Sequence, residues 1–265
     1  TCVRTDLALM GSSLKGRVIQ TVRNNPEVFP ENAMMKKYRN NLVRKSRLTI
    51  VQNNQQKQYF PETQWVKIKV LPNPVSSTLS QIERREDESQ FKIVGVGRLE
   101  AQKNFDLLID AVADVSEKYG NVKLNIYGEG SMKNHLQEHI DRINLGQKIT
   151  LKGRSSDYSE IYGTASAFVL SSDFEGMPNT LLEAMAVGLP CISTDCPTGP
   201  SDIIESGKNG ILVPMGDRNR LSQEIEKLIQ HNEMRIDLAK AAKQTILSRY
   251  TPEKITQKFI SICEE

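Results

Sequence analysis

The feature that most constrains this chain is a regular alternation, from residue 91 onward, of short β-rich runs with longer runs of helical periodicity. In residues 104–118, for example, Leu107, Ala111 and Val115 share one apolar helix face. Such alternation favours a parallel sheet with helices on both faces, because each helix returns the chain to the start of the next strand. We therefore predict a Rossmann-like α/β domain with strands at 91–96, 122–127, 149–151, 167–170, 191–193 and 211–213.

The first 75 residues form a second, smaller pattern of the same kind. Strands are predicted at 17–22, 48–51 and 67–71, and helices at 33–45 and 54–59. Three strands and about two helices make a poor independent domain, so we interpret residues 1–75 as the C-terminal part of an α/β domain that begins outside this sequence. The predicted organisation is completed by a Ser-rich and charged linker at 76–90, the Rossmann-like domain at 91–250 and a terminal helix at 251–265.

Charge is divided unevenly along the chain. Residues 1–80 hold 13 Lys and Arg against 4 Asp and Glu, whereas residues 81–265 hold 22 against 28. This asymmetry indicates two units with different surfaces to present. Four scattered cysteines favour a reduced, cytoplasmic protein, and the sequence contains no nucleic-acid recognition module, so no nucleic-acid partner is expected.

A basic amphipathic helix is predicted within residues 34–47. Met34, Tyr38 and Leu42 recur at four-residue steps among six lysines and arginines. Such a helix can lie on an anionic membrane surface or meet an anionic acceptor. A solvated helix face is the more common explanation, and both interpretations stay open here.

Glycine turns follow three of the predicted strands of the main domain. Gly97 and Arg98 end the first strand and precede Lys103, Gly128 ends the second, and a Gly-Arg-Ser turn ends the third. Ligands of open α/β sheets bind at this carboxyl edge, where glycine permits close backbone approach. Two cations there can clamp a diphosphate, although an ordinary turn with two surface cations is the more common explanation of the first segment taken alone.

Residues 174–190 run from a loop into a helix that starts near Pro178 and ends at Gly188. Glu175 and Glu183 lie eight positions apart on either side of that helix start. Free N–H groups at a helix start can hold a phosphate, and a carboxylate on each side suits the hydroxyls at the two ends of a sugar nucleotide. Glu183 has a rival role, since Thr180-x-x-Glu183 also matches a capping box, and Glu175 is equally compatible with a solvated loop acid.

The segment His135-x-x-Glu138-His139 matches the inverted zinc-protease pattern. It lies on a polar helix after a glycine turn, so surface histidines are the better interpretation and no metal site is predicted.

With these motifs in view, the chain resembles the retaining glycosyltransferases of family 4, which have the two-Rossmann GT-B architecture. The resemblance runs from about residue 17 to residue 265 and is strongest over 92–216. It rests on an ordered set of segments, of which the Cys-Pro-x-Gly-Pro variant is similar to bacterial surface-polysaccharide enzymes. The segments are 96–99 with Lys103, 127–130, Glu175-x7-Glu183, 196–204 and 209–214.

The resemblance implies a role for each matching residue. Arg98 and Lys103 would neutralise the donor diphosphate without a metal ion, Glu175 would contact the donor sugar, and Glu183 would hold the ribose. As the resemblance has it, Glu175 is not a covalent nucleophile, and Glu175, Arg98 and Lys103 form the catalytic set. The implied contacts with the base and with the sugar phosphates come from Arg154 and Ser155, from backbone at Gly97 and Gly128, and from the helix start at Gly176, Met177, Pro178, Asn179 and Thr180.

The expected activity is transfer of a hexosyl or N-acetylhexosaminyl group from a nucleotide sugar, UDP-linked by resemblance, with retention and without a further cofactor. The implied acceptor is a glycan or a polyprenyl-diphosphate-linked sugar. The protein itself is expected in the cytoplasm or at a peripheral position on the inner face of the membrane. This chain alone is expected to hold the donor, and it can lack turnover. The alternatives are a sugar-nucleotide epimerase, a phosphorylase, or a fragment that binds UDP without turnover.

Overall fold

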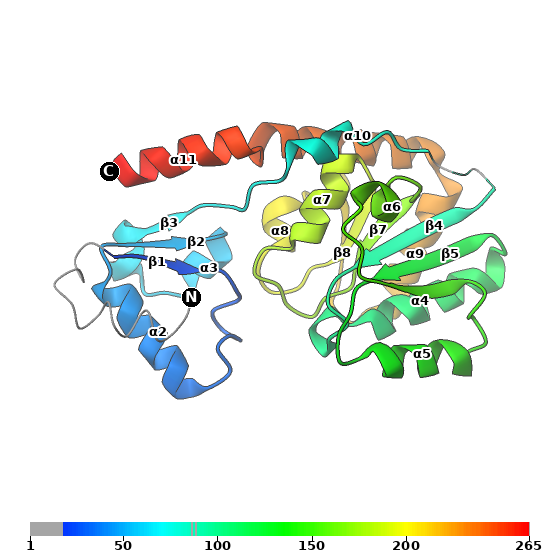
Figure 1. Cartoon of the computed structure of the whole chain (residues 1–265), viewed down its shortest axis with the longest axis horizontal. Coiled ribbons are helices and arrows are strands. Elements are labelled where there is room, and N and C mark those ends of the chain that lie inside the picture. Colours follow the sequence, from blue (N-terminus) through cyan, green and yellow to red (C-terminus); the bar gives the residue numbers. More distant parts are fainter. Residues whose placement is uncertain (1–17, 86, 88, 265) are drawn as a thin grey trace.

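The structure is a computed structural model that describes residues 18–85, 87 and 89–264. It contains two parallel sheets, one of six strands and one of three, in two units joined by the chain at about residue 75 (Figure 1). The predicted α/β fold with parallel sheets and flanking helices is therefore confirmed. Cys2, the first residue of the predicted strand 17–22 and the last residue of the predicted terminal helix lie outside the described residues.

The larger sheet has the strand order β6-β5-β4-β7-β8-β9, so the chain order reverses between β4 and β7. Its first strand lies in the centre, and the chain fills one half of the sheet before it crosses to the other. The predicted strands agree with the observed ones except that two run further toward the carboxyl edge. The bounds are β4 (Phe91–Val96), β5 (Val122–Tyr127), β6 (Ile149–Gly153), β7 (Ala167–Leu170), β8 (Cys191–Thr194) and β9 (Ile211–Val213).

Helices cover both faces of this sheet because successive strand residues point to opposite sides. Ile93 of β4 belongs to one apolar core and its neighbour Val94 to the other. The first core is closed by α4, α5 and α9, and the second by α6, α7 and the second half of α10. The bounds are α4 (Phe105–Lys118), α5 (Lys133–Arg142), α6 (Tyr158–Tyr162), α7 (Asn179–Val187), α8 (Pro200–Ile203), α9 (Arg218–Gln230) and α10 (Asn232–Arg249).

The smaller unit is a three-stranded sheet in the order β1-β2-β3 with its own small core. Helix α11 (Pro252–Glu264) extends from the larger unit over this sheet (Figure 1), where Ile262 packs with Leu48 and Ile50. The other elements are β1 (Ile19–Val22), α2 (Ala33–Lys45), β2 (Leu48–Val51), α3 (Asn54–Gln58), a 3-10 helix (Glu62–Lys67) and β3 (Ile68–Val70).

The segment predicted as a linker packs against the larger unit. It contains a 3-10 helix (Ser77–Gln81), and the side chains of Val75 and Leu79 are buried in the core beside α7. The Val75 N–H donates to the Tyr250 carbonyl at 2.8 Å, and Arg84 donates to the carbonyls of Gly188 and Ala165 at 2.9 Å. The segment lacks helical periodicity, yet these few apolar and basic side chains fix it in place.

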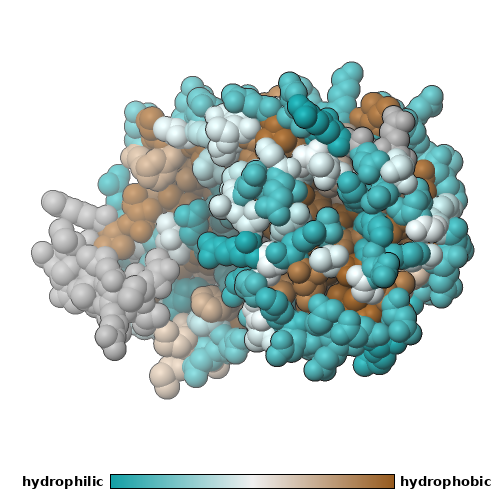
Figure 2. Space-filling view, turned by 45° about the vertical axis from the view of Figure 1, so that its right-hand side comes forward, coloured by the Kyte–Doolittle hydropathy of each residue, from teal (hydrophilic) through white to brown (hydrophobic). Residues whose placement is uncertain are grey.

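The carboxyl ends of the large-sheet strands point toward the smaller unit (Figure 1). Any ligand at that edge therefore lies next to both units. Within residues 18–85, 87 and 89–264, no helix combines the length and the apolar character needed to cross a bilayer. Hydrophilic residues cover most of the face that Figure 2 shows.

Candidate functional site

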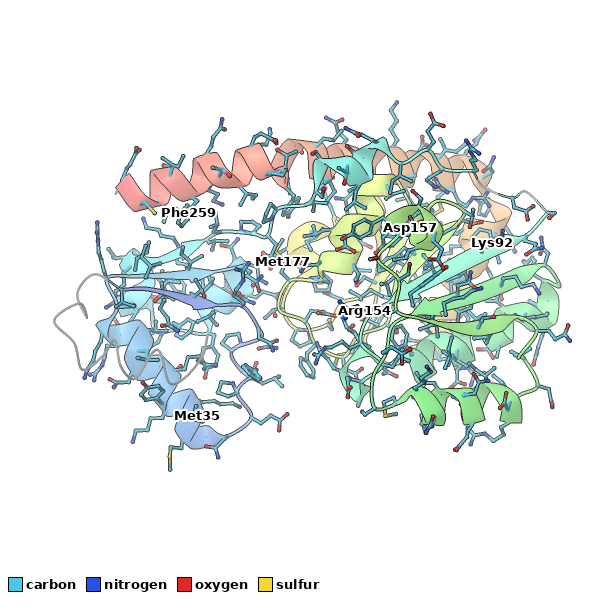
Figure 3. The ribbon with its side chains drawn as sticks, in the orientation of Figure 1. Met35, Lys92, Arg154, Asp157, Met177 and Phe259 are labelled. Atoms are coloured by element: carbon cyan, nitrogen blue, oxygen red, sulfur yellow. The ribbon has the colours of Figure 1, made fainter. Side chains whose placement is uncertain are left out.

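The candidate site lies where β4 and β7 end, at the point of the larger sheet where the chain order reverses. Open α/β sheets bind ligands at such a switch point because the loops that follow the two strands separate there. Figure 3 shows Met177 and Arg154 on this edge, on the side that faces the smaller unit. The loops after β4, β5, β6, β7 and β8 bring most of the predicted site residues together.

The centre of the site is an ion pair between Lys103 and Glu175. Lys103 Nζ lies 2.6 Å from Glu175 Oε1, and the two side chains are only 12% and 7% exposed. The Ser172 hydroxyl donates to the same carboxylate oxygen at 2.7 Å. A carboxylate buried to this degree needs a cation and further hydrogen bonds to offset its lost hydration. Glu175 is therefore a buried carboxylate that Lys103 and Ser172 hold in place, and its interpretation as a solvated loop acid is wrong.

The two loops that carry this pair are tied to each other through Gln102, which the sequence analysis missed. The Gln102 side-chain amide donates to the Phe174 carbonyl at 2.7 Å, and the Gln102 backbone carbonyl accepts from the Asp173 N–H at 2.9 Å. Arg98 is exposed at the rim of the site, with Nη2 3.3 Å from Gln102 Oε1. The Arg98 guanidinium thus remains next to solvent while Lys103 lies inside.

The start of α7 presents unused backbone donors. Hydrogen bonds among the described residues leave the N–H groups of Gly176, Met177, Asn179 and Thr180 without a protein acceptor. Pro178 occupies the N-cap position and has no N–H to satisfy. Free donors together with the helix dipole make this helix start suited to a negatively charged group.

The capping box proposed for Thr180 and Glu183 does not form. Pro178 is the N-cap, no side chain caps the helix, and the Thr180 hydroxyl is buried without a hydrogen-bond partner. Glu183 instead accepts a 2.9 Å hydrogen bond from the Tyr162 hydroxyl. Burial raises the pKa of Glu183, and the hydrogen bond from Tyr162 offsets part of this effect. Glu183 is thus free of a capping role and held at the side of α7 that packs on α6.

The glycine turns lie close together at the carboxyl edge. Gly128 has φ +153°, and a Cβ there would lie 1.8 Å from the Gly97 carbonyl oxygen, so the β4 and β5 loops meet backbone to backbone. The side chain of Lys103 lies over Gly97, where a Cβ would meet its Cε at 2.9 Å. Arg154 is exposed after β6, and the Ser155 hydroxyl donates to Glu160 Oε2 at 2.6 Å. These last two residues form the outer wall of the site.

The histidine pair lies outside this site. His135 Nε2 and His139 Nδ1 contact the Asp106 carboxylate at 3.0 and 2.8 Å, and His139 Nε2 contacts Asp110 at 3.0 Å. His139 is buried, so the prediction of two surface histidines is wrong for this residue, because it packs α5 against α4. In the part of the chain that the structure describes, no group of three or more His, Cys, Asp and Glu is placed to hold a metal ion.

Ser172 and Thr198 were also missed, and both contact Glu175. The Thr198 hydroxyl donates to the Glu175 carbonyl oxygen, and the Glu175 N–H donates to the Pro197 carbonyl at 3.2 Å. Ser172 follows β7 at a short distance and Thr198 lies in the loop after β8. Their place after strands of a parallel sheet was the only available sequence signal, and many serines and threonines share it.

The fold and the site together define an α/β protein of the GT-B glycosyltransferase type. The sequence profile of the family described as Glycosyl transferases group 1 matches residues 78–245, and the chain belongs to this family. The match covers the linker segment, the larger sheet and most of its helices.

Known relatives share this assignment. The chain is 35% identical over 196 residues to an uncharacterized glycosyltransferase of Methanocaldococcus jannaschii, a match that covers 65% of this chain and 48% of the relative. It is 32% identical to the poly(ribitol-phosphate) alpha-N-acetylglucosaminyltransferase of Staphylococcus aureus, over 64% of this chain and 35% of that protein. This chain therefore spans about half or less of the length of these curated relatives.

A solved structure extends the similarity to the smaller unit. A variant of Staphylococcus aureus TarM, crystallised with Fondaparinux, alpha-GlcNAc-glycerol and UDP, superposes with a TM-score of 0.80 at 26% identity. The superposition covers 92% of this chain and 50% of the TarM chain. Both units of this chain therefore have counterparts in the TarM structure.

Proposed function

We propose that this chain carries the donor-binding part of a glycosyltransferase that uses a nucleotide sugar, and that the nucleotide is UDP. The observation that carries the proposal is the buried Lys103–Glu175 pair beside the open N–H groups of α7. A diphosphate is the ligand that these cations and donors suit, and Glu175 is the acceptor that sugar hydroxyls require. The UDP bound to the related TarM variant supports the choice of nucleotide.

In the proposed reaction the charge on the departing diphosphate is neutralised by this chain's own cations. Lys103 has three donors, so its ammonium can keep Glu175 and still contact a phosphate oxygen. Arg98 at the rim adds a forked contact from the solvent side. Donors aimed at developing charge in a partly closed site stabilise the transition state, which is why we propose transfer without a metal ion. Retention at the donor carbon is proposed from the family resemblance alone.

The nucleoside is proposed to lie toward Glu183 and the turn after β6. The Glu183 carboxylate would accept from the ribose hydroxyls in addition to Tyr162, and the buried Thr180 hydroxyl is a further group without a protein partner at this place. Arg154 and Ser155 would flank the base at the outer wall. The raised pKa of Glu183 accords with an acid that gains further partners when a donor binds.

The acceptor is proposed to enter from the smaller unit and to be a glycan or a lipid-linked sugar. Helix α2 exposes Lys37, Arg44 and Lys45, whereas Arg39 turns inward, its guanidinium 5.0 Å from the Tyr59 ring centre. Burial withdraws the Arg39 guanidinium from the basic face and lowers its pKa. The remaining exposed cations suit an anionic acceptor or membrane surface, as the resemblance implies.

The vesicle test of this surface uses the charge on α2. Binding to vesicles that contain about one third anionic lipid should fall by tenfold or more when Lys37 and Lys45 are changed to Glu, and neutral vesicles should bind neither protein. Equal sedimentation of the two proteins with anionic vesicles would remove the membrane proposal.

The donor assignment is tested by calorimetry with UDP. Arg98→Ala should weaken UDP binding about tenfold, because a lost charge-assisted contact costs about 1.5–3 kcal/mol. Arg142→Ala is the matched control, since Arg142 is exposed at the far end of α5. Identical affinities of the Arg98 variant and the native chain would contradict the assignment of the diphosphate to this rim.

A further inference from the structure

The loop that carries Glu175 is also held from the smaller unit, by a contact that the proposed function does not use. Asn53 Nδ2 and Gln56 Nε2 both donate to the Gly176 carbonyl oxygen, at 2.7 and 3.2 Å. Asn53 is the N-cap of α3 and Gln56 lies in its first turn, and the two amide side chains are 3% and 0% exposed. Two buried amides from one unit thus converge on a single carbonyl of the other.

The orientation of both amides is fixed by their other bonds. Asn53 Oδ1 accepts from the Gln56 N–H at 2.8 Å and caps α3, so its nitrogen must face Gly176. Gln56 Oε1 accepts from the Gln52 N–H at 2.7 Å, which directs its nitrogen the same way. The contact therefore does not depend on an arbitrary choice between amide oxygen and nitrogen.

The approach of the two units is close at this point. A Cβ on Gly176 would lie 2.8 Å from the Arg23 carbonyl oxygen and 2.9 Å from the Asn24 Cα, so only glycine fits. A second contact lies beside it, where Asn73 Nδ2 donates to Asn179 Oδ1 at 2.6 Å. The start of α7 thus packs directly on the backbone of the smaller unit.

These bonds set the direction of the open N–H groups on the loop. In a planar trans peptide the C=O and the following N–H point in opposite directions. Because Asn53 and Gln56 hold the Gly176 carbonyl on the side of the smaller unit, the Met177 N–H must point away from it. Thr198 does the same for the preceding peptide, since it holds the Glu175 carbonyl and so directs the Gly176 N–H.

We propose that Asn53 and Gln56 are positioning residues for the donor, and that they aim the Met177 N–H at its distal phosphate and sugar. The inference rests on the proposed function above, because it concerns the same ligand. Neither side chain touches the donor itself; each acts through the Gly176 carbonyl. The geometry of the donor loop then depends on the smaller unit being in place.

The test replaces both amides by isosteric acids in the full chain. Asn53→Asp and Gln56→Glu each keep the acceptor oxygen that serves α3 or Gln52, and each puts an acceptor in place of the donor that faces Gly176. Gln58→Glu is the control, because it makes the same amide-to-acid change at an exposed position at the end of α3. The readout is calorimetric binding of UDP and of UMP, which lacks the distal phosphate.

The double variant should bind UDP about tenfold more weakly and UMP within twofold of the native chain. A purely structural role of the amides would weaken both ligands together, and no role would change neither; either result overturns the inference. If the native chain itself fails to bind UDP, the proposed function fails.

If the native chain does not bind UDP, the role of the two amides is tested by hydrogen exchange of the loop without ligand. The peptide that covers 174–181 should exchange about tenfold faster in the double variant and at the native rate in the control. Unchanged exchange in the double variant would show that the amides do not hold this loop.

Discussion

Removal of the positive charge from Lys103 should destabilise the chain and weaken its UDP binding for two separable reasons. Lys103→Met keeps the methylene chain over Gly97 but leaves Glu175, 7% exposed, with the Ser172 hydroxyl as its remaining close partner. Breaking a buried ion pair from one side costs about 3–5 kcal/mol, and the retained hydrogen bond places the expected loss near 3 kcal/mol. This is a large part of the total stability of an ordinary domain.

The second variant isolates that cost. Glu175→Gln preserves shape, and in the combination of Glu175→Gln with Lys103→Met no unpaired buried charge is left, so about 2 kcal/mol of the loss should return. UDP binding should not return, because the lysine that contacts the diphosphate is still missing. Recovered stability without recovered affinity is the signature of a pair that serves the ligand.

Both quantities are measured on the same set of proteins, stability by urea unfolding and affinity by calorimetry. Lys133→Met is the control, because Lys133 pairs with Glu129 at 3.0 Å but both side chains are about half exposed. Such a surface pair is worth less than about 1 kcal/mol. If Lys103→Met costs no more than Lys133→Met, the Lys103–Glu175 pair does not have the energetic weight of a buried ion pair. If the double variant binds UDP like the native chain, Lys103 is not a donor contact.

The remaining predictions concern Glu183 and Gly128. Because burial raises the folded-state pKa of Glu183, the folded chain holds this proton more tightly, so native stability falls as the pH rises from about 4.5 through the raised value. Glu183→Gln removes this fall. The difference in free energy of unfolding, variant minus native chain, should therefore increase between about pH 4.5 and pH 7 when measured by urea unfolding. A difference that stays constant over this range would contradict the raised pKa of Glu183. Gly128→Ala should lower the free energy of unfolding by about 3 kcal/mol or more, because its Cβ would meet the Gly97 carbonyl oxygen. In Gly97→Ala the new Cβ would meet only the flexible Lys103 side chain, so the loss should be about 1 kcal/mol. Equal losses in urea unfolding would refute the backbone contact.

The strands were predictable because a short run of β-forming residues between helical segments is a local property of the sequence. The one clear extension, β6 to Gly153, comes from pairing with β5, where the register shifts between Ile126 and Tyr127. Such a shift depends on the neighbouring strand, so the sequence of the 149–153 segment does not reveal it. Local patterns thus locate elements well and their ends at the ligand edge less well.

The role of Glu183 was undecidable from spacing, because Thr180-x-x-Glu183 satisfies a capping box and a ligand site equally. The structure excludes the capping box through the position of the helix start. Helix α7 begins at Asn179, so Thr180 lies inside the first turn and cannot act as the N-cap. An uncertainty of two residues in a helix boundary was enough to leave the capping role of a site residue open.

The contacts across the two units had no sequence signal. Asn53 and Gly176 are 123 positions apart, and polar amides near a short helix are common in any chain. Only the folded chain brings the β2–α3 turn against the start of α7. The charged residues of the candidate site were predicted because cations suit a diphosphate and carboxylates suit sugar hydroxyls, whereas the neutral residues that hold the loop were not predicted.

That division between charged and neutral residues has a physical reason. Lys103 and Arg98, which we propose to meet the diphosphate, come from the larger unit. The hydrogen bonds that the smaller unit makes to the Gly176 carbonyl and to Asn179 come from neutral amides, those of Asn53, Gln56 and Asn73. A lysine in place of Asn53 would attract the diphosphate itself and compete with the site for its ligand. A neutral amide directs the loop through one carbonyl without adding charge to the site. The smaller unit can therefore control the geometry of donor binding while the larger unit supplies its electrostatics.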